Sequence, residues 1–523
     1  MIRRPPRSTQ SRSSAASDVY KRQALGGGGI MDIGCYTISF SRLIAGAALG
    51  KNWVNPVEIK SLGHIRNDSK VDTWATALLR FENDILAYCV CGVESRHQNC
   101  AAIYGTKGII IIPNPWTPTS HEVKKYSFTL VSENGKATII TESAPNVFTC
   151  ETSVVTESIQ QGLLEAPHPA MSWEDTLGNM QTLDRWRESL SLTFPTETEE
   201  AYKYTLDHKP LKVRPNSRMK YGEIKGLDAK ISKLVMGVVN PGNIAYATAM
   251  FDDFFARGGN TFDTAYIYAG GSAEKLLGKW IENRNIRKDV IVIDKGAHTP
   301  HCFPDILLKQ FEESLERLRT DYVDIYFMHR DNPDIPVGEF VEVLNQLQAK
   351  RKLKIFGGSN WTIKRIIEAN EWAKRNKKQG FSAISNNFSL ARMINPVWEG
   401  CIASSEPAFR EWHEKTQFPL FAWSSQAQGF FVPGRTSPEK KDNSSMVHAW
   451  YSPDNFERQE RCFALAKKKN VHPNTIVLAY VLNQLFPVFA LIGPMSINEI
   501  LPSIDALDIV LTSDEIAWLD LRK

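Results

Sequence analysis

Four side chains between residues 263 and 329 are of the types needed to deliver a proton to a carbonyl oxygen. Asp263 ends an apolar run in FDTAYIYAG, Tyr268 follows five residues later, Lys295 ends VIVIDK and His329 ends DIYFMH. A tyrosine with a pKa near 10 is a poor acid at neutral pH unless its phenolate is stabilised. An adjacent ammonium group lowers that pKa, and a buried carboxylate would keep the lysine charged. The set predicts general acid catalysis, which is worth about 10² to 10⁴ in rate.

Each residue alone has a structural explanation as a strand-end cap, a lysine reaching the rim or a buried histidine. The four together indicate a catalytic role, because unpaired charges at the ends of apolar strands cost several kcal/mol of stability.

The elements that must position these residues begin at residue 231. Short apolar runs there alternate with amphipathic stretches, and eight such units fit within about 290 residues, as a (β/α)8 TIM barrel requires. Catalytic residues of such barrels lie at the C-terminal ends of the strands. The eight predicted strands are KLVMGV, TFDTA, DVIVIDK, VDIYFMH, LKIFGGS, SAISNN, PLFAWSS and VFALIGP.

The order of the motifs FDTAxxYxxG, VIVIDKG, DYxDxxxxHRxxP and GGSNW resembles the aldo/keto reductase superfamily over about residues 225–521. The resemblance implies that Asp263, Tyr268, Lys295 and His329 form the catalytic tetrad of an NAD(P)-dependent oxidoreductase. It also implies that an aldehyde or ketone is reduced, with Tyr268 as proton donor. Asp294 departs from the family, which usually has a small residue there, and strand alternation predicts that its side chain faces the helices.

The resemblance also implies a site for the nicotinamide end of the cofactor. Ser359 and Asn360 of GGSNW would hydrogen-bond the carboxamide, and Trp423 would stack on the ring. Ser385 stands where a glutamine commonly contacts the nicotinamide, so that contact is expected to be altered.

The phosphate and adenosine end is assigned in the same way to Ser424, Gly493, Ser496 and Glu499, the serine at 496 close to a helix N-terminus. Met495 stands where a basic residue commonly binds the 2′-phosphate of NADPH. Loss of such a charge-assisted contact costs about 1.5–3 kcal/mol. The cofactor is therefore NADP or NAD, and NADH use is plausible.

Residues 24–200 differ in pattern from the barrel. Short β-rich runs, with turn signals at Glu82-Asn83 and Asn134-Gly135, precede two helical stretches and predict an α+β antiparallel open-sheet domain. The motifs at 26–46, 104–116 and 168–189 resemble the second domain of Gfo/Idh/MocA oxidoreductases, near the dihydrodiol and xylose dehydrogenases. Asp32 and Tyr36 match that family's sugar-site positions.

The dinucleotide-binding Rossmann domain of that family has no counterpart here, since no strand–GxGxxG–helix unit precedes residue 200. We therefore expect the N-terminal half to serve folding and oligomerisation, or to be the remnant of a longer two-enzyme fusion. Residues 201–225, charged and aperiodic, are predicted to be a linker between residues 24–200 and the barrel domain at 226–523. The Arg- and Ser-rich leader 1–23 resembles a transit peptide or a translated adapter sequence, and it is predicted to be disordered or artefactual.

The composition restricts partners and compartment. A net charge of +4 without a basic stripe argues against nucleic acid, and no apolar run approaches the ~18 residues that cross a membrane. Eight scattered cysteines without CxxC pairs argue against a zinc site and favour the cytoplasm. The expected partner is a small carbonyl compound, possibly sugar-derived by association with the sugar-oxidising family, and the exposed sheet makes a homodimer plausible. Two alternatives remain: an NAD(P)H-sensing module with little turnover, and a dehydrogenase completed by an upstream Rossmann domain.

Overall fold

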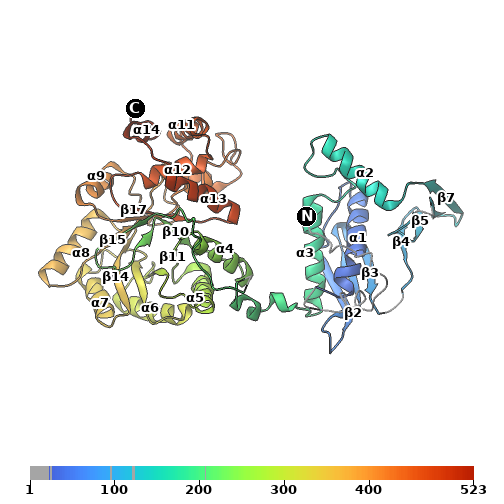
Figure 1. Cartoon of the computed structure of the whole chain (residues 1–523), viewed down its shortest axis with the longest axis horizontal. Helices are drawn as coiled ribbons and strands as arrows, with labels where there is room; N and C mark the ends of the chain where they lie inside the picture. The colour runs from blue at the N-terminus through green and yellow to red at the C-terminus, as the bar shows by residue number, and fades with distance from the viewer. Residues whose placement is uncertain (1–22, 24–25, 95–96, 121–123, 206–207) are drawn as a thin grey trace. The chain divides into compact units, whose positions relative to one another are not determined.

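A computed structural model describes residues 23, 26–94, 97–120, 124–205 and 208–523. The chain divides into two compact units, Met1–Ala201 and Tyr202–Lys523, each with its own core (Figure 1). Except for Gln23, the predicted leader 1–23 lies outside the described residues. No helix among the described residues is both long and apolar enough to cross a bilayer.

The N-terminal unit contains two antiparallel sheets, of strand order β1-β2-β3 and β4-β5-β6-β7. The turns predicted at Glu82-Asn83 and Asn134-Gly135 connect β2 to β3 and β6 to β7. The strands are β1 (Glu58–Ile65), β2 (Asp72–Arg80), β3 (Leu86–Gly92), β4 (Cys100–Gly105), β5 (Gly108–Pro113), β6 (Lys125–Ser132) and β7 (Ala137–Ser143). The helices are η3 (Ile30–Gly34), α1 (Cys35–Ala48), α2 (Val147–Gln160) and α3 (Trp173–Ser189).

One face of the β1–β3 sheet is buried and the other is open. Because side chains alternate across a strand, Ala75, Ala77 and Leu79 of β2 face α1 and α3 and pack with Trp186. The opposite side carries apolar residues that remain exposed, among them Leu78 and its cross-strand partner Tyr88. This is the open sheet that the sequence predicts.

In the second unit, eight parallel strands close into a barrel, in sequence order from β10 to β17, with helices around it (Figure 1). This confirms the predicted fold class. The strands are β10 (Leu234–Gly237), β11 (Thr261–Asp263), β12 (Ile291–Gly296), β13 (Val323–Met328), β14 (Leu353–Ser359), β15 (Ala383–Ser385), β16 (Leu420–Ala422) and β17 (Val488–Ile492). The helices are α4 (Ile244–Ala256), α5 (Ser272–Arg284), α6 (Pro304–Leu318), α7 (Val337–Ala349), α8 (Ile363–Arg375), α9 (Pro407–Thr416), α10 (Ser444–Trp450), α11 (Pro453–Lys469), α12 (Pro473–Leu482), α13 (Ile497–Asp505) and α14 (Ser513–Leu519).

The barrel has two apolar layers. One fills the interior, where Ile293, Phe327 and Phe421 meet, and the other lies between the strands and the helices. Successive residues of β12 alternate between them: Ile291 and Ile293 point inward and Val292 points outward.

The segment predicted as a linker, 201–225, differs from that expectation where it is described. Arg284 Nη1 donates to the Tyr202 carbonyl at 2.8 Å, and Met219 is buried in the outer layer. The pair β8 (Tyr221–Gly222) and β9 (Ile231–Ser232) follows, and Ile224 belongs to the interior layer. Isolated apolar residues in a charged stretch carry no periodic signal, although each buries its side chain against the barrel.

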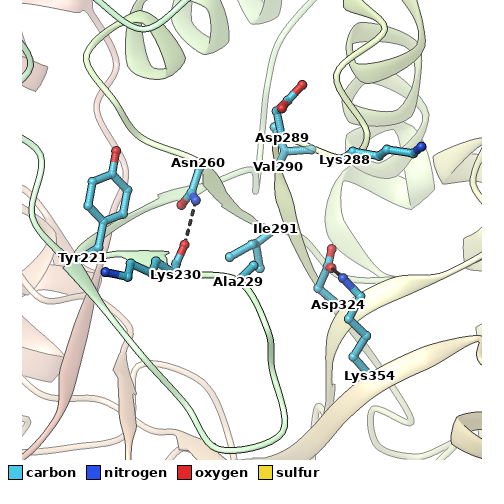
Figure 2. A pocket seen from close by; sticks show the side chains of 10 residues that line it. All are labelled: Tyr221, Ala229, Lys230, Asn260, Lys288, Asp289, Val290, Ile291, Asp324 and Lys354. Carbon is cyan, nitrogen blue, oxygen red and sulfur yellow. Dashed lines mark hydrogen bonds and ion pairs between the residues drawn. The ribbon is translucent and has the colours of Figure 1, made fainter. Parts of the chain in front are cut away.

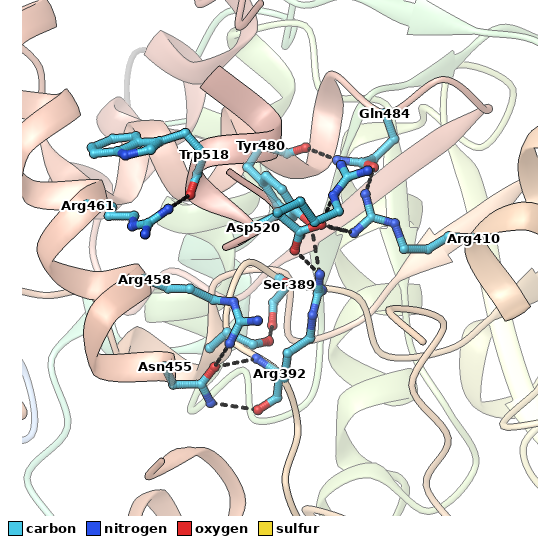
Figure 3. A network of polar contacts seen from close by, with 12 residues as sticks. Ser389, Arg392, Arg410, Asn455, Arg458, Arg461, Tyr480, Gln484, Trp518 and Asp520 are labelled. Atoms are coloured by element: carbon cyan, nitrogen blue, oxygen red, sulfur yellow. Dashed lines mark hydrogen bonds and ion pairs between the residues drawn. The ribbon is translucent and has the colours of Figure 1, made fainter. Parts of the chain in front are cut away.

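A buried carboxylate on the last turn of the chain holds a distant segment in place. Asp520 binds Arg410 of α9 at 2.5 Å and also receives Arg392, which follows β15 (Figure 3). Tyr480 of α12 donates its hydroxyl to the same carboxylate at 3.1 Å. Both ends of segment 389–410 are thus attached to Asp520 or to residues bonded to it.

Candidate functional site

The pleat of the barrel strands aims the predicted site residues at one place. In β12, Lys295 follows Ile291 and Ile293 in the inward positions, and in β13 His329 follows Ile325 and Phe327. The same rule turns six residues inward at the C-terminal ends of six consecutive strands. They are Asp263, Lys295, His329, Ser359, Ser385 and Trp423.

The structure brings together the four residues that the sequence predicts to transfer the proton. Lys295 Nζ donates to both oxygens of Asp263 at 2.6 Å and to the Thr264 carbonyl at 2.8 Å. The same ammonium lies 4.9 Å from the centre of the Tyr268 ring, and the Tyr268 and His329 rings are 5.6 Å apart, edge to face. Tyr268 begins the short helix η7 (Tyr268–Gly271) after β11.

Burial decides the charge states of this cluster. Burial alone would lower the pKa of Lys295, but the Asp263 carboxylate beside it raises the pKa overall, so the lysine stays charged. Burial, with the nearby charge of Lys295 and Arg330, holds the pKa of His329 well below its ordinary value. His329 is therefore a neutral imidazole.

The expected lowering of the tyrosine pKa does not occur in the protein without ligands. Burial raises the pKa of Tyr268 and outweighs the opposing effect of the Lys295 charge. The phenol therefore stays protonated across the physiological range, which is the form that a proton donor needs.

Asp294 faces the helices, as strand alternation predicts. It is fully buried beside Glu274 of α5 and Ser314 of α6. Burial and the charge of Glu274 raise the pKa of Asp294 well above its ordinary value, which favours the neutral carboxylic acid. It does not compete with Asp263 for Lys295.

Two residues outside the predicted tetrad also reach this cluster. The His298 ring packs 4.8 Å from that of His329, edge to face, and its Nδ1 lies 2.8 Å from the Thr299 carbonyl. Nδ1 is therefore the protonated nitrogen, because a carbonyl only accepts. Arg330 follows His329 and is 5% exposed. The sequence signal for each was its position: His298 lies three residues after Lys295, and Arg330 lies one residue after His329.

The residues expected at the nicotinamide end lie next to one another. Ser359 and Ser385 are paired in register on β14 and β15, and Asn360 donates to the Ser359 hydroxyl at 3.1 Å. The Ser385 hydroxyl and Trp423 Nε1 are buried and have no hydrogen-bond partner among the described residues. Unsatisfied polar atoms at this edge fit a polar ring group such as a carboxamide.

Two of the residues expected at the phosphate end, Ser496 and Glu499, lie at the start of α13. Ser496 caps that helix by accepting from the Glu499 N–H at 3.3 Å, and Glu499 Oε2 accepts from the Met495 N–H at 2.7 Å. Gly493 follows β17 with open space where a side chain would begin, and Ser424 follows Trp423 in a left-handed conformation. The helix start thus already holds a carboxylate.

A hollow of about 260 Å³ lies at the opposite end of the strands (Figure 2). Its wall includes Asn260, which precedes β11, and Asp324 near the start of β13. Asp324 is paired with Arg287 at 2.9 Å and with Lys354 at 2.6 Å. These ion pairs join neighbouring strands at the end of the barrel away from Tyr268.

The sequence matches the aldo/keto reductase family over residues 233–521, more than half of the chain. The chain belongs to the aldo/keto reductase family. Its members are NAD(P)-dependent oxidoreductases, so this protein is an enzyme of that class. A second match, to the GFO/IDH/MocA C-terminal domain, covers residues 4–111.

Several fungal proteins are similar to this aldo/keto reductase. The norsolorinic acid reductase of Aspergillus flavus is 25% identical over 347 residues, which cover 60% of this chain and 83% of the relative. An aryl-alcohol dehydrogenase of Pestalotiopsis microspora is 26% identical over 322 residues, covering 56% of this chain and 78% of the relative. Among solved structures, an aldo-keto reductase of Klebsiella pneumoniae in complex with NADPH is 24% identical, covers 58% of this chain and 95% of its own, and has a TM-score of 0.44.

Replacing the buried acid of this aldo/keto reductase should change its stability in a pH-dependent way. The folded protein favours the protonated form of Asp294, whereas the same carboxyl in the unfolded chain ionises near pH 4. The free energy of unfolding therefore falls as the pH rises from about 4 towards the pKa of Asp294 in the folded state. Asp294→Asn removes this loss. We expect its melting temperature, relative to wild type, to be several degrees higher at pH 8 than at pH 5, by thermal unfolding at both pH values.

Asp289→Asn is the matched control, because Asp289 is exposed and lies two residues before the first residue of β12. Its melting temperature should follow wild type. A stability difference for Asp294→Asn that does not grow with pH would mean that Asp294 is ionised in the folded protein.

Proposed function

We propose that this aldo/keto reductase reduces an aldehyde or ketone to an alcohol, with Asp263, Tyr268, Lys295 and His329 as its catalytic residues. The observation that supports this most is the cluster itself. A charged lysine, held by Asp263 at 2.6 Å, lies 4.9 Å from the ring of a protonated tyrosine beside a neutral histidine.

In the proposed reaction the Tyr268 hydroxyl gives its proton to the carbonyl oxygen as a hydride reaches the carbonyl carbon. The Lys295 ammonium stabilises the phenolate that remains, and Asp263 keeps that ammonium in place. Neutral His329 carries one N–H, which donates a hydrogen bond to the same carbonyl oxygen. The phenolate then takes a proton from water before the next turnover.

A nicotinamide dinucleotide supplies the hydride when bound. We assign its carboxamide to Ser359, Asn360 and Ser385. Ser359 and Ser385 are paired in register beside the cluster, Asn360 donates to the Ser359 hydroxyl, and the buried Ser385 hydroxyl has no partner among the described residues. Trp423 is the residue placed to pack on the ring, and it lies on the strand after Ser385.

The substrate that we favour is an aromatic carbonyl compound. Trp398 of segment 389–410 lies 6.0 Å from Trp423, and His298 adds another flat ring near His329. Aromatic rings prefer such neighbours. Relatives named aryl-alcohol dehydrogenases agree with this choice. A sugar-derived carbonyl rests only on the association with the GFO/IDH/MocA domain, and rates on benzaldehyde and on glyceraldehyde would separate the two.

Removing one hydroxyl tests the function. Tyr268→Phe should lower kcat for carbonyl reduction by about 100-fold or more, because the proton donor is lost. Cofactor affinity, followed by tryptophan quenching, should stay within about twofold, since no cofactor contact is removed. Tyr266→Phe is the control: its hydroxyl donates to Glu313 at 2.6 Å, away from Lys295, and its activity should be near wild type. Wild-type turnover in Tyr268→Phe would refute the assignment.

We further propose that NADH is bound at least as well as NADPH. The stretch 493–500 contains no lysine or arginine, and the Glu499 carboxylate lies at the start of α13. An acidic group accepts a hydrogen bond from a ribose 2′-hydroxyl but repels a 2′-phosphate.

Met495→Arg should therefore tighten NADPH binding by roughly 10-fold or more, the effect of one charge-assisted contact, and leave NADH affinity nearly unchanged. Glu499→Gln should act in the same direction. Titrations that follow tryptophan quenching measure both affinities, with Met495→Leu as the control of equal size. Wild-type protein that binds NADPH tenfold more tightly than NADH would contradict this preference.

Two copies are proposed to associate through the open face of the β1–β3 sheet. Leu62 and Leu86 there are 75% and 74% exposed, and Leu78 lies between them at 57%. Contiguous exposed apolar surface of this kind marks an interaction site.

We place the enzyme in the cytoplasm, because all eight cysteines are free thiols.

Analytical ultracentrifugation of the full chain should then give twice the 59.0 kDa of one copy. Leu78→Glu should return it to one copy, since a charge cannot be buried unpaired, whereas Leu308→Glu on α6 should not. A monomeric wild type at micromolar concentration would end this proposal.

A further inference from the structure

Arg330 is a buried cation without a carboxylate partner. It is 5% exposed, and no carboxylate oxygen of the described residues forms an ion pair with it within 4.0 Å. Its Nη1 donates to the His329 carbonyl at 2.9 Å and its Nη2 meets the Cys401 sulfur at 3.5 Å. Its Nε has no hydrogen-bond partner among the described residues.

Among the other buried arginines of the described residues, Arg458 is bonded to the Asn455 amide oxygen at 3.1 Å, whereas others are paired with carboxylates. Arg410 binds Asp520 at 2.5 Å and Arg187 binds Glu197 at 2.7 Å. The carboxylate next to Arg330 in sequence, Asp331, is held by Arg365 at 2.8 Å. An unpaired buried charge costs several kcal/mol, and a thiol sulfur is a weak acceptor that offsets little of it.

The Arg330 guanidinium lies close to the candidate site. Its charge lowers the pKa of His329 and opposes the raised pKa of Tyr268, so it acts on the site where the carbonyl oxygen is protonated. On its other side lie Gly400 and Cys401, in the segment that Asp520 holds at both ends. The guanidinium therefore lies between the proton donor and the segment that borders the site.

We propose that Arg330 binds a carboxylate of the substrate, so that the enzyme acts on aldehydes or ketones that also carry an acid group. This rests on the proposed carbonyl reduction and specifies its substrate class. A guanidinium presents five N–H donors in a fixed fork that matches a carboxylate, and at least its Nε is free to donate. The carboxylate supplies the charge that the protein itself leaves out.

The experiment compares three aromatic aldehydes, of which one carries a carboxylate, one its neutral ester and one no substituent. Wild-type protein is assayed with 3-carboxybenzaldehyde, its methyl ester and benzaldehyde, at saturating NADH or NADPH. We expect kcat/KM for the acid to exceed that for the ester. Arg330→Gln should lower kcat/KM for the acid roughly 10- to 150-fold and change the other two less than about threefold, the effect of losing one charged contact. Arg330→Lys should recover part of the loss.

Lys288→Gln is the control for the change in net charge, because Lys288 is an exposed cation at the far end of the strands. It should leave all three kcat/KM values unchanged. Benzoate and benzamide titrations of unliganded protein, followed by tryptophan quenching, add a measurement that needs no turnover: only benzoate binding should weaken in Arg330→Gln. The melting temperature of this variant should equal or exceed that of wild type, since an uncompensated charge is removed.

Three results would overturn the inference. Equal losses for all three substrates would make Arg330 part of the protonation site, and a selective loss of NADH or NADPH affinity would make it a cofactor contact. A lowered melting temperature with unchanged selectivity would make it structural. By contrast, no turnover of any carbonyl by wild-type protein would refute the proposed function, while the benzoate titration would still test the site.

Discussion

In a closed barrel every second side chain of each strand points at the axis, and this geometric constraint governs the site. The inward positions of β12 carry Ile291, Ile293 and then Lys295, and those of β13 end in His329. Apolar side chains fill the earlier inward positions of these strands, and polar side chains occupy only the inward positions at the C-terminal ends. A shift of one residue in any of these strands would turn its functional side chain towards the helices.

The same constraint separates two carboxyl groups on the strands around Lys295, Asp263 on β11 and Asp294 on β12. Asp263 faces inward and is bonded to the lysine, whereas Asp294, the immediate neighbour of Lys295, faces α5 and α6. The pleat thus places one acid against an ammonium and the other beside Glu274, whose charge and the burial of Asp294 raise the pKa of Asp294. Proximity in sequence says nothing about pairing here, and the direction of the side chain decides it.

The strands, the barrel and the clustering of the four proton-transfer residues could be predicted, because each depends on short-range pattern and on strand parity. The pKa of Tyr268 could not, since its direction depends on how far burial outweighs the Lys295 charge. Nor could the role of Ile224 at the barrel interior, as one apolar residue in a charged stretch has no periodicity. The lack of a carboxylate partner for Arg330 could not be predicted either. It depends on which carboxylates are already paired with other cations, as Asp331 is with Arg365.

The attachment of segment 389–410 has a consequence for how the protein is made. Asp520 follows Arg410 by 110 residues and Arg392 by 128. Synthesis adds roughly 5–20 residues per second, so Asp520 is made on the order of 6–25 s after segment 389–410. During that interval Arg392 and Arg410 are cations without their carboxylate. The border of the site is therefore among the last parts of the barrel to settle, long after the strands that carry Asp263 and Lys295 have been made.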